Sequence, residues 1–157
     1  MKDITVPIEE YTLNIRASVI IQHQESFLAH HNIHSDHYAL LGGRVQIGED
    51  SKETVKREVK EELGKEIEIT GYIATIENFF KMKGSNYHEI LFVYQGEFKE
   101  KEDQKLQETL YNQEGKEHLH YEWIPIEKIE HYPLKPEVIK EVLQEKNFPI
   151  HKINREI

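Results

Sequence analysis

The chain has 157 residues, of which 38% are hydrophobic and 31% are charged, and it contains no cysteine. This length and composition predict one folded domain over residues 1–157 and exclude extensive disorder. Without cysteine, the chain can form neither a disulfide, nor a thiolate metal site, nor a cysteine nucleophile. A protein without disulfides suits a reducing compartment, so we expect a cytoplasmic location.

The formal net charge of −9 at pH 7 would repel a nucleic acid polymer, which we therefore do not expect as a partner. No apolar run approaches the roughly 20 residues of a membrane-spanning helix, and the first residues lack the features of a signal peptide. We therefore expect no membrane association. A small anionic substrate fits this charge where a divalent cation lies between it and the carboxylates.

The first part of the chain carries the alternating apolar and β-branched residues that are typical of strands. Residues 1–10 are expected to be either flexible or strand-forming. Strands are predicted over 12–22 and 26–30, followed by a polar loop over 31–37 that leads into YALL at 38–41.

The segment from Ser51 to Leu63 contains neither Gly nor Pro and predicts a helix. Ser51, after Asp50, is the expected N-cap, and Gly64 follows where a left-handed C-cap belongs. Val55, Val59 and Leu63 recur every four positions and form a narrow apolar stripe that would pack on a sheet.

The second part of the chain predicts further strands and a final helix. Residues 66–80 predict one or two strands, 83–86 predict a turn, and 87–98 predict a further strand. Residues 99–116 predict a charged loop with a helical stretch near 106–111. A last strand is predicted over 118–125 and a helix over 136–144. Strands on both sides of a helix, with another helix at the end, predict an α/β sandwich in which a mixed sheet packs between helices.

Three glutamates lie on one face of the predicted helix. At about 100° per residue, Glu58, Glu61 and Glu62 fall within one sector, beside the apolar stripe. Like charges at this spacing repel each other by a few tenths of a kcal/mol per pair on an isolated helix. A divalent cation such as Mg²⁺ or Mn²⁺ would offset the repulsion.

A glutamate-rich helix has a simpler interpretation, in which the charged face is only solvated. In that case Arg57 would bridge Glu53 and Glu61 along the helix. The residues that flank the helix favour the metal site.

The segment from Gly43 to Gly64 resembles the signature of the Nudix hydrolases. That signature reads Gly, five residues, Glu, seven residues, Arg-Glu, an aliphatic residue, any residue, Glu-Glu, any residue, Gly and an aliphatic residue. The matching residues are Gly43, Glu49, Arg57, Glu58, Val59, Glu61, Glu62 and Gly64. Lys65 stands at the last aliphatic position, and we expect Ile67 to take over its packing role.

The resemblance implies a Nudix-type α/β/α sandwich and a metal-dependent hydrolase. Such an enzyme cleaves the phosphoanhydride bond of a nucleoside di- or triphosphate, or of a nucleoside diphosphate derivative, by water attack on phosphorus. It implies that Glu58 and Glu62 are the principal ligands of Mg²⁺ or Mn²⁺, with Glu61 a ligand or base and Glu49 a weaker or water-mediated ligand. Arg57 would orient a neighbouring carboxylate.

Other candidates lie outside the signature. A further catalytic carboxylate is often seen in the family; Glu89 is the first candidate, because it stands within an apolar strand, and Glu114 and Glu117 are the others. An edge-strand charge explains Glu89 equally well. Gly42 and Gly43 would let the backbone approach the substrate or the helix, and Arg16 would contact a phosphate.

The sequence leaves several functional alternatives open. A non-catalytic Nudix-like module that binds a nucleotide is the second hypothesis, and a structural or protein-interaction domain with an incidental acidic helix is the third. The complete set of signature residues favours catalysis. Family markers of ADP-ribose and coenzyme A enzymes are absent, which favours nucleoside triphosphates, oxidised ones included. Members of the family are often dimers, so a homodimer is a further expectation.

Overall fold

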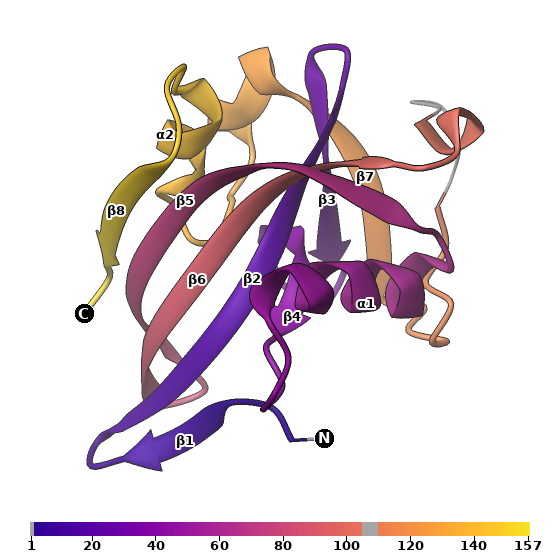
Figure 1. Cartoon of the computed structure of the whole chain (residues 1–157). Helices are drawn as coiled ribbons and strands as arrows, with labels where there is room; N and C mark the ends of the chain where they lie inside the picture. Colours follow the sequence, from indigo (N-terminus) through magenta and orange to yellow (C-terminus); the bar gives the residue numbers. More distant parts are fainter. Residues whose placement is uncertain (1, 105–109) are drawn as a thin grey trace.

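The computed structural model describes residues 2–104 and 110–157. Its strands form one mixed sheet in the order β7-β3-β4-β2-β6-β5-β8, and β1 pairs with β2 (Figure 1). The strands are β1 Thr5–Ile8, β2 Tyr11–His23, β3 Ser26–Asn32, β4 Tyr38–Arg44, β5 Ile67–Met82, β6 Ser85–Phe98, β7 Leu119–Pro125 and β8 Ile150–Arg155. The helices are α1 Ser51–Leu63 and α2 Ile139–Gln144, with 3₁₀ turns at Lys101–Gln104 and Ile126–His131.

Strand β2 organises the centre of the sheet because it pairs with strands on both sides. It runs parallel to β6, from Tyr11 opposite Asn86 to Ile21 opposite Gly96. It runs antiparallel to β4, where Ala17 lies opposite Gly43. The sheet is therefore mixed, as the sequence predicts.

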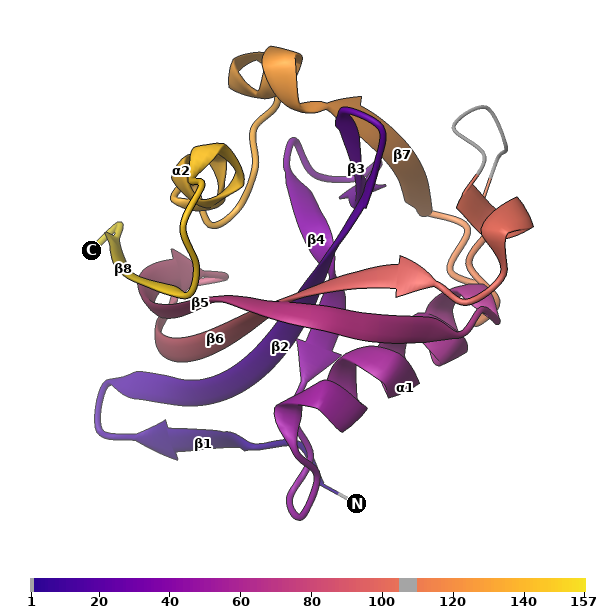
Figure 2. The same cartoon turned by 45° about the horizontal axis from the view of Figure 1, so that its top comes forward.

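The two faces of the sheet carry separate hydrophobic cores. On β2, Val19 and Ile21 pack on the face that α1 covers, with Val55 and Val59 of the helix. Ile20, between them in the sequence, packs on the opposite face with residues of α2. Figure 2 shows α1 and α2 on the two sides of the strands, which confirms the predicted sandwich.

Helix α1 has the predicted bounds, but its N-cap differs by one residue. The Asp50 side chain accepts a hydrogen bond from the Glu53 backbone N–H at 2.9 Å and is the cap. Ser51 is the first helical residue, and its hydroxyl lies 2.6 Å from the hydroxyl of Tyr94 on β6. Gly64 ends the helix at φ 70°, as expected.

The other differences lie towards the C-terminus. The predicted strand at 66–80 is the single long strand β5, which forms a hairpin with β6, and α2 begins three residues later than predicted. β8 was not predicted, because IHKINR alternates too few apolar residues to stand out from a loop. Most of the predicted helical stretch near 106–111 lies outside the described residues. Over the described ranges, neither helix is long and apolar enough to cross a membrane.

The departure from the signature at Lys65 is compensated in the packing. Ile67 is only 2% exposed and packs in the same core as Val59 and Leu63. The ammonium of Lys65 lies 2.5 Å from the carboxylate of Asp103, at the edge of this core. Ile67 thus supplies the apolar contact, as expected, while Lys65 forms an ion pair.

We predict that Ile67→Ala lowers the free energy of unfolding by about 2–5 kcal/mol, because it leaves a cavity beneath α1. Lys65→Ala should cost about 1 kcal/mol or less, because its ion pair is partly solvated. Urea denaturation of both variants and the wild type measures the difference. Equal losses in the two variants would contradict this assignment of the packing role.

Candidate functional site

Two glycines near the end of β4 allow close approaches of its neighbours, α1 at Gly43 and β2 at Gly42. A Cβ atom at Gly43 would lie 2.3 Å from the carboxyl carbon of Glu58. A Cβ atom at Gly42 would lie 2.1 Å from the backbone oxygen of Ala17 on β2. Neither space admits a side chain, so the glycines let the Glu58 carboxylate lie against the backbone of β4.

Arg57 joins the turn before α1 to the carboxylate face of the helix. Its guanidinium donates to Glu49 at 2.7 and 3.0 Å, to Glu58 at 2.9 Å and to Glu61 at 3.2 Å. It also donates to the backbone oxygen of Arg44 at 3.2 Å. The contact with Glu61 agrees with the solvated-helix interpretation, but the expected partner Glu53 is replaced by Glu49 and Glu58.

Glu49 is engaged on both carboxylate oxygens. Besides Arg57, it accepts from the Thr54 hydroxyl at 2.8 Å and from the Gln46 backbone N–H at 3.2 Å. The hydrogen bonds from Arg57, and secondarily those from Thr54 and Gln46, lower the pKa of Glu49 to about 2. Glu49 therefore holds the turn and orients Arg57.

Glu62 lies in a very different environment. It is 7% exposed, and its Oε2 atom is buried with no hydrogen-bond partner in the described part of the chain. Burial, followed by the charges of Glu58 and Glu114, raises the pKa of Glu62 to about 8. Burial likewise raises the pKa of Glu58. The inner carboxylates of α1 thus lack a cationic partner strong enough to offset their desolvation.

This arrangement fits a divalent cation, although the described residues contain no ready-made group of three or more metal-ligating side chains. The fit rests on the unpartnered Glu62 oxygen and on the space that Gly43 leaves for the Glu58 carboxylate. Carboxylate oxygens are the ligands that Mg²⁺ and Mn²⁺ prefer. Glu58, Glu61 and Glu62 are the residues that could hold such an ion.

The loop before β7 closes on the C-terminal end of α1. The Gln113 backbone N–H donates to the Glu62 backbone oxygen at 2.7 Å. Asn112 donates to the hydroxyl of Tyr121 at 2.8 Å, and burial and then the Glu62 charge raise the pKa of Tyr121 to about 12. Glu114 is a candidate from the sequence, whereas Asn112 and Tyr121 were not predicted. The signal available for Tyr121 was an aromatic residue among the polar residues of the predicted strand at 118–125.

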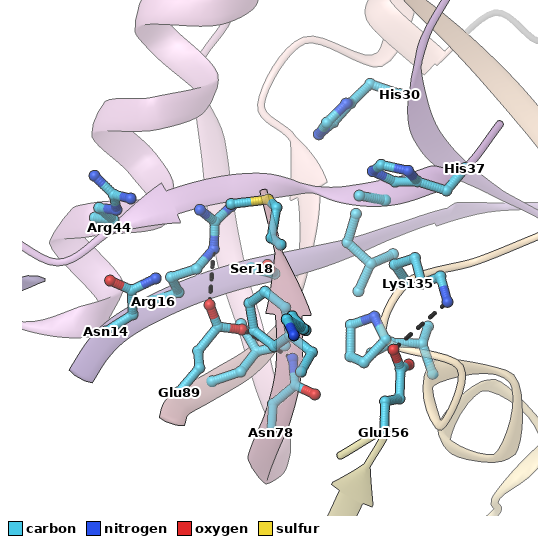
Figure 3. A pocket seen from close by; sticks show the side chains of 18 residues that line it. Asn14, Arg16, Ser18, His30, His37, Arg44, Asn78, Glu89, Lys135 and Glu156 are labelled. Atoms are coloured by element: carbon cyan, nitrogen blue, oxygen red, sulfur yellow. Dashed lines mark hydrogen bonds and ion pairs between the residues drawn. The ribbon is translucent and has the colours of Figure 1, made fainter. Parts of the chain in front are cut away.

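A cavity of about 380 Å³ opens on the α2 side of the sheet (Figure 3). It follows from the period of two along β2, which places Asn14, Arg16 and Ser18 on this face. Helix α2 and the residues before it form the opposite side. The lining residues are Asn14, Arg16, Ser18, His30, His37, Ala39, Leu40, Arg44, Asn78, Phe80, Lys81, Met82, Glu89, Leu91, Lys135, Pro136, Ile139 and Glu156.

Arg16 and Glu89, both named from the sequence, meet in this cavity. Glu89 is 4% exposed, and one of its oxygens lies 3.8 Å from the Arg16 guanidinium. The charge of Arg16 also lowers the pKa of Glu58 and of Glu62, against the dominant effect of burial. Both residues line the cavity, and the charge of Arg16 also acts on the carboxylates of α1.

The rim of the cavity carries positive charge. Arg44, Lys81 and Lys135 line it, and Lys135 lies 3.6 Å from Glu156. Lys135 and Glu156 were missed, because nothing in their local sequence separates them from ordinary surface charges. In a chain of net charge −9, this local surplus of cations favours an anionic ligand.

Comparisons with known proteins agree with the geometry. The NUDIX domain family model matches residues 12–145. The MutT protein from Methanosarcina mazei is 22% identical with a TM-score of 0.61, and the match covers 88% of this chain and 94% of that one. An ADP-ribose pyrophosphatase from Streptococcus suis is 13% identical with a TM-score of 0.62, and the match covers 88% of this chain and 98% of that one. The E. coli ORF135 protein is 22% identical with a TM-score of 0.55, and the match covers 88% of this chain and 91% of that one. Comparison with curated protein sequences gives no match.

We predict that His30 makes the fold less stable in acid. Burial, followed by the charges of Arg16 and His37, lowers the pKa of His30 to about 4, against a smaller opposing effect from the Leu40 backbone. The unfolded chain takes up a proton near pH 6.5 and the folded chain only near 4, so the stability present above pH 6.5 is lost as the pH falls towards 4.

The measurement is urea denaturation of the wild type and of His30→Gln at pH 8, 6 and 4. Between pH 8 and 4 the wild type should lose about 1–3 kcal/mol more than the variant, whose side chain does not titrate. The difference in unfolding free energy between the wild type and His30→Gln at pH 8 is the control for changes in packing. Parallel losses in the two proteins would contradict the prediction.

Proposed function

Because the chain belongs to the NUDIX family of hydrolases, we propose that it hydrolyses the phosphoanhydride bond of a nucleoside di- or triphosphate, or of a nucleoside diphosphate derivative, with a bound divalent cation. The observation that carries this proposal is the buried, unpartnered oxygen of Glu62 on the same helix face as Glu58. A buried carboxylate with no donor is costly unless a proton or a cation joins it.

Glu58 and Glu62 would be the principal ligands of Mg²⁺ or Mn²⁺, with Glu61 a ligand or a base. When bound, the cation neutralises phosphate charge and activates water for attack on phosphorus. Arg57 positions the Glu58 and Glu61 carboxylates through its hydrogen bonds. Glu49 acts mainly through Arg57, because its oxygens already accept four hydrogen bonds.

The substrate phosphates would lie at the side of the cavity nearest α1, where Arg16 and Arg44 are opposite each other on β2 and β4. The Arg16 side chain is one-third exposed and lines the cavity, so it is accessible to a ligand. Gly42 and Gly43 keep the backbone of β4 free of side chains at this point. A guanidinium fits phosphate oxygens through paired N–H donors.

Among the carboxylates outside the signature, Glu114 is the one we assign to the catalytic group. It follows Gln113, whose backbone N–H donates to the Glu62 backbone oxygen at 2.7 Å, and its charge contributes to the raised pKa of Glu62. Glu89 contacts Arg16 and Asn78 in the cavity instead. Nucleoside triphosphates remain the substrates that we favour, and a cytoplasmic location and a homodimer remain predictions.

We predict that Glu62→Gln lowers kcat by at least 100-fold in Mg²⁺ or Mn²⁺, because a neutral amide binds a hard cation poorly. Glu53→Gln, on the exposed side of the same helix, is the matched control and should keep near-normal activity. The measurement is phosphate or pyrophosphate release from a panel of nucleoside triphosphates, sugar nucleotides and dinucleotides.

Two results would count against the proposal. Hydrolysis that persists in excess chelator would exclude the cation from the mechanism. Saturable nucleotide binding by the wild type without turnover of any substrate, in either metal, would favour the non-catalytic binding module.

We also predict that Gly43→Ala lowers kcat/KM by at least tenfold, because the added Cβ displaces the Glu58 carboxylate. Gly71→Ala on β5 is the control, since its added Cβ would meet only the Gln95 side chain at 3.5 Å or more. Both variants are to be assayed at a temperature where circular dichroism shows them folded. Unchanged activity in Gly43→Ala would show that the position of Glu58 is not critical.

A further inference from the structure

We propose that Glu89 is a specificity-determining residue, whose carboxylate binds a nucleobase edge that presents two adjacent N–H donors, the pattern found in guanine. This inference deepens the proposed function and rests on it, because it assumes that the cavity in Figure 3 holds the nucleoside of the substrate.

The contacts of Glu89 leave room for a ligand. One oxygen, Oε1, accepts a hydrogen bond from the Asn78 amide at 3.2 Å. The other, Oε2, has the Arg16 guanidinium at 3.8 Å, which is beyond hydrogen-bond distance. A carboxylate has about four acceptor positions, so this buried group, within the described residues, has capacity for further donors.

The carboxylate is also held in a defined orientation. Asn154 of β8 donates to the Asn78 side-chain oxygen at 2.8 Å, which turns the Asn78 amide nitrogen towards Glu89. All three side chains are less than one-tenth exposed and come from adjacent strands. A fixed acceptor pair of this kind discriminates between ligands more sharply than a mobile one.

The surroundings favour a base over a sugar at this position. Leu40, Leu91 and Ile139 are buried apolar residues that line the same cavity. They suit the flat apolar faces of a base, whereas ribose hydroxyls would need more polar partners. The cations that suit phosphates, Arg16 and Arg44, lie together where β2 pairs with β4, on the side of the cavity nearest α1.

Among the common bases, guanine fits the carboxylate best. Its N1–H and N2–H groups point the same way and can donate to two carboxylate oxygens at once. Adenine and cytosine present an amino group beside a ring nitrogen whose lone pair repels the second oxygen. In uracil and thymine, the single N–H lies between two carbonyl oxygens, which repel it on both sides.

Equilibrium binding tests this inference independently of turnover. Dissociation constants of GMP, IMP and AMP, which contain no phosphoanhydride bond that the protein could hydrolyse, are to be measured by isothermal titration calorimetry with the wild type in buffer that contains Mg²⁺. Hypoxanthine keeps N1–H but lacks the N2 amino group, and adenine lacks both. We expect GMP to bind at least about tenfold more tightly than IMP, and IMP more tightly than AMP.

The variant Glu89→Gln should bring the three affinities within about threefold of one another, because one amide end then presents N–H groups to the base. Glu97→Gln, an exposed carboxylate on the same strand β6 that does not line the cavity, is the matched control and should keep the guanine preference. Thermal melts followed by circular dichroism check that both variants are folded.

Four results would overturn the inference. Three of them are equal affinity of the wild type for GMP and AMP, a guanine preference that survives in Glu89→Gln, and no measurable binding of GMP at millimolar concentration. The fourth is a loss of discrimination between GMP and 2′-deoxy-GMP in Glu89→Gln, which would place the carboxylate at the ribose. Loss of hydrolysis with the binding preference intact would contradict only the proposed function.

Discussion

The guanidinium of Arg57 is the contact on which the arrangement of the site depends. It binds three carboxylates and a backbone oxygen of β4 at the same time. Without it, Glu49, Glu58 and Glu61 would repel one another close to a buried fourth carboxylate, Glu62. A planar group with five donors in a fixed geometry can satisfy several acceptors together, which a lysine in this position could not do. The turn, the helix and the strand are therefore held in one relative position by charge as well as by packing.

Arg57 nevertheless leaves the inner part of the site incompletely neutralised. Its hydrogen bonds reach Glu58 but not Glu62, whose second oxygen is buried without a partner in the described residues. This division is compatible both with a stable helix and with the proposed cation. Glu49, Glu58 and Glu61 are bound by Arg57, and the Glu62 oxygen is left for a ligand that brings positive charge.

The part of the site that the sequence predicts is the part that lies on one continuous segment. The spacing from Gly43 to Gly64 predicts the helix and the shared face of its glutamates, because helical geometry relates residues that are close in sequence. The contact between Arg57 and Glu49 could not be predicted from that geometry, since it depends on the turn at 45–50, which brings Glu49 back onto the helix. Glu89 was recognised as an unusual charge in an apolar strand. Asn78 and Asn154 could not be recognised as its neighbours, because only the pairing of β5 with β6 and β8 brings these three residues together.

The two short strands at the margins of the sheet, β1 and β8, have a common physical role. Both are largely exposed and add little to either core. Each, however, contributes one polar contact to the cavity. The Thr5 hydroxyl donates to the Asn14 side chain at 2.6 Å, and the Asn154 amide donates to Asn78 at 2.8 Å. An amide that accepts on its oxygen from a neighbouring strand presents its N–H groups on the other side, towards the cavity. The core strands and α1 therefore hold the groups proposed for the chemistry, and the marginal strands orient polar groups that line the cavity proposed for the nucleoside.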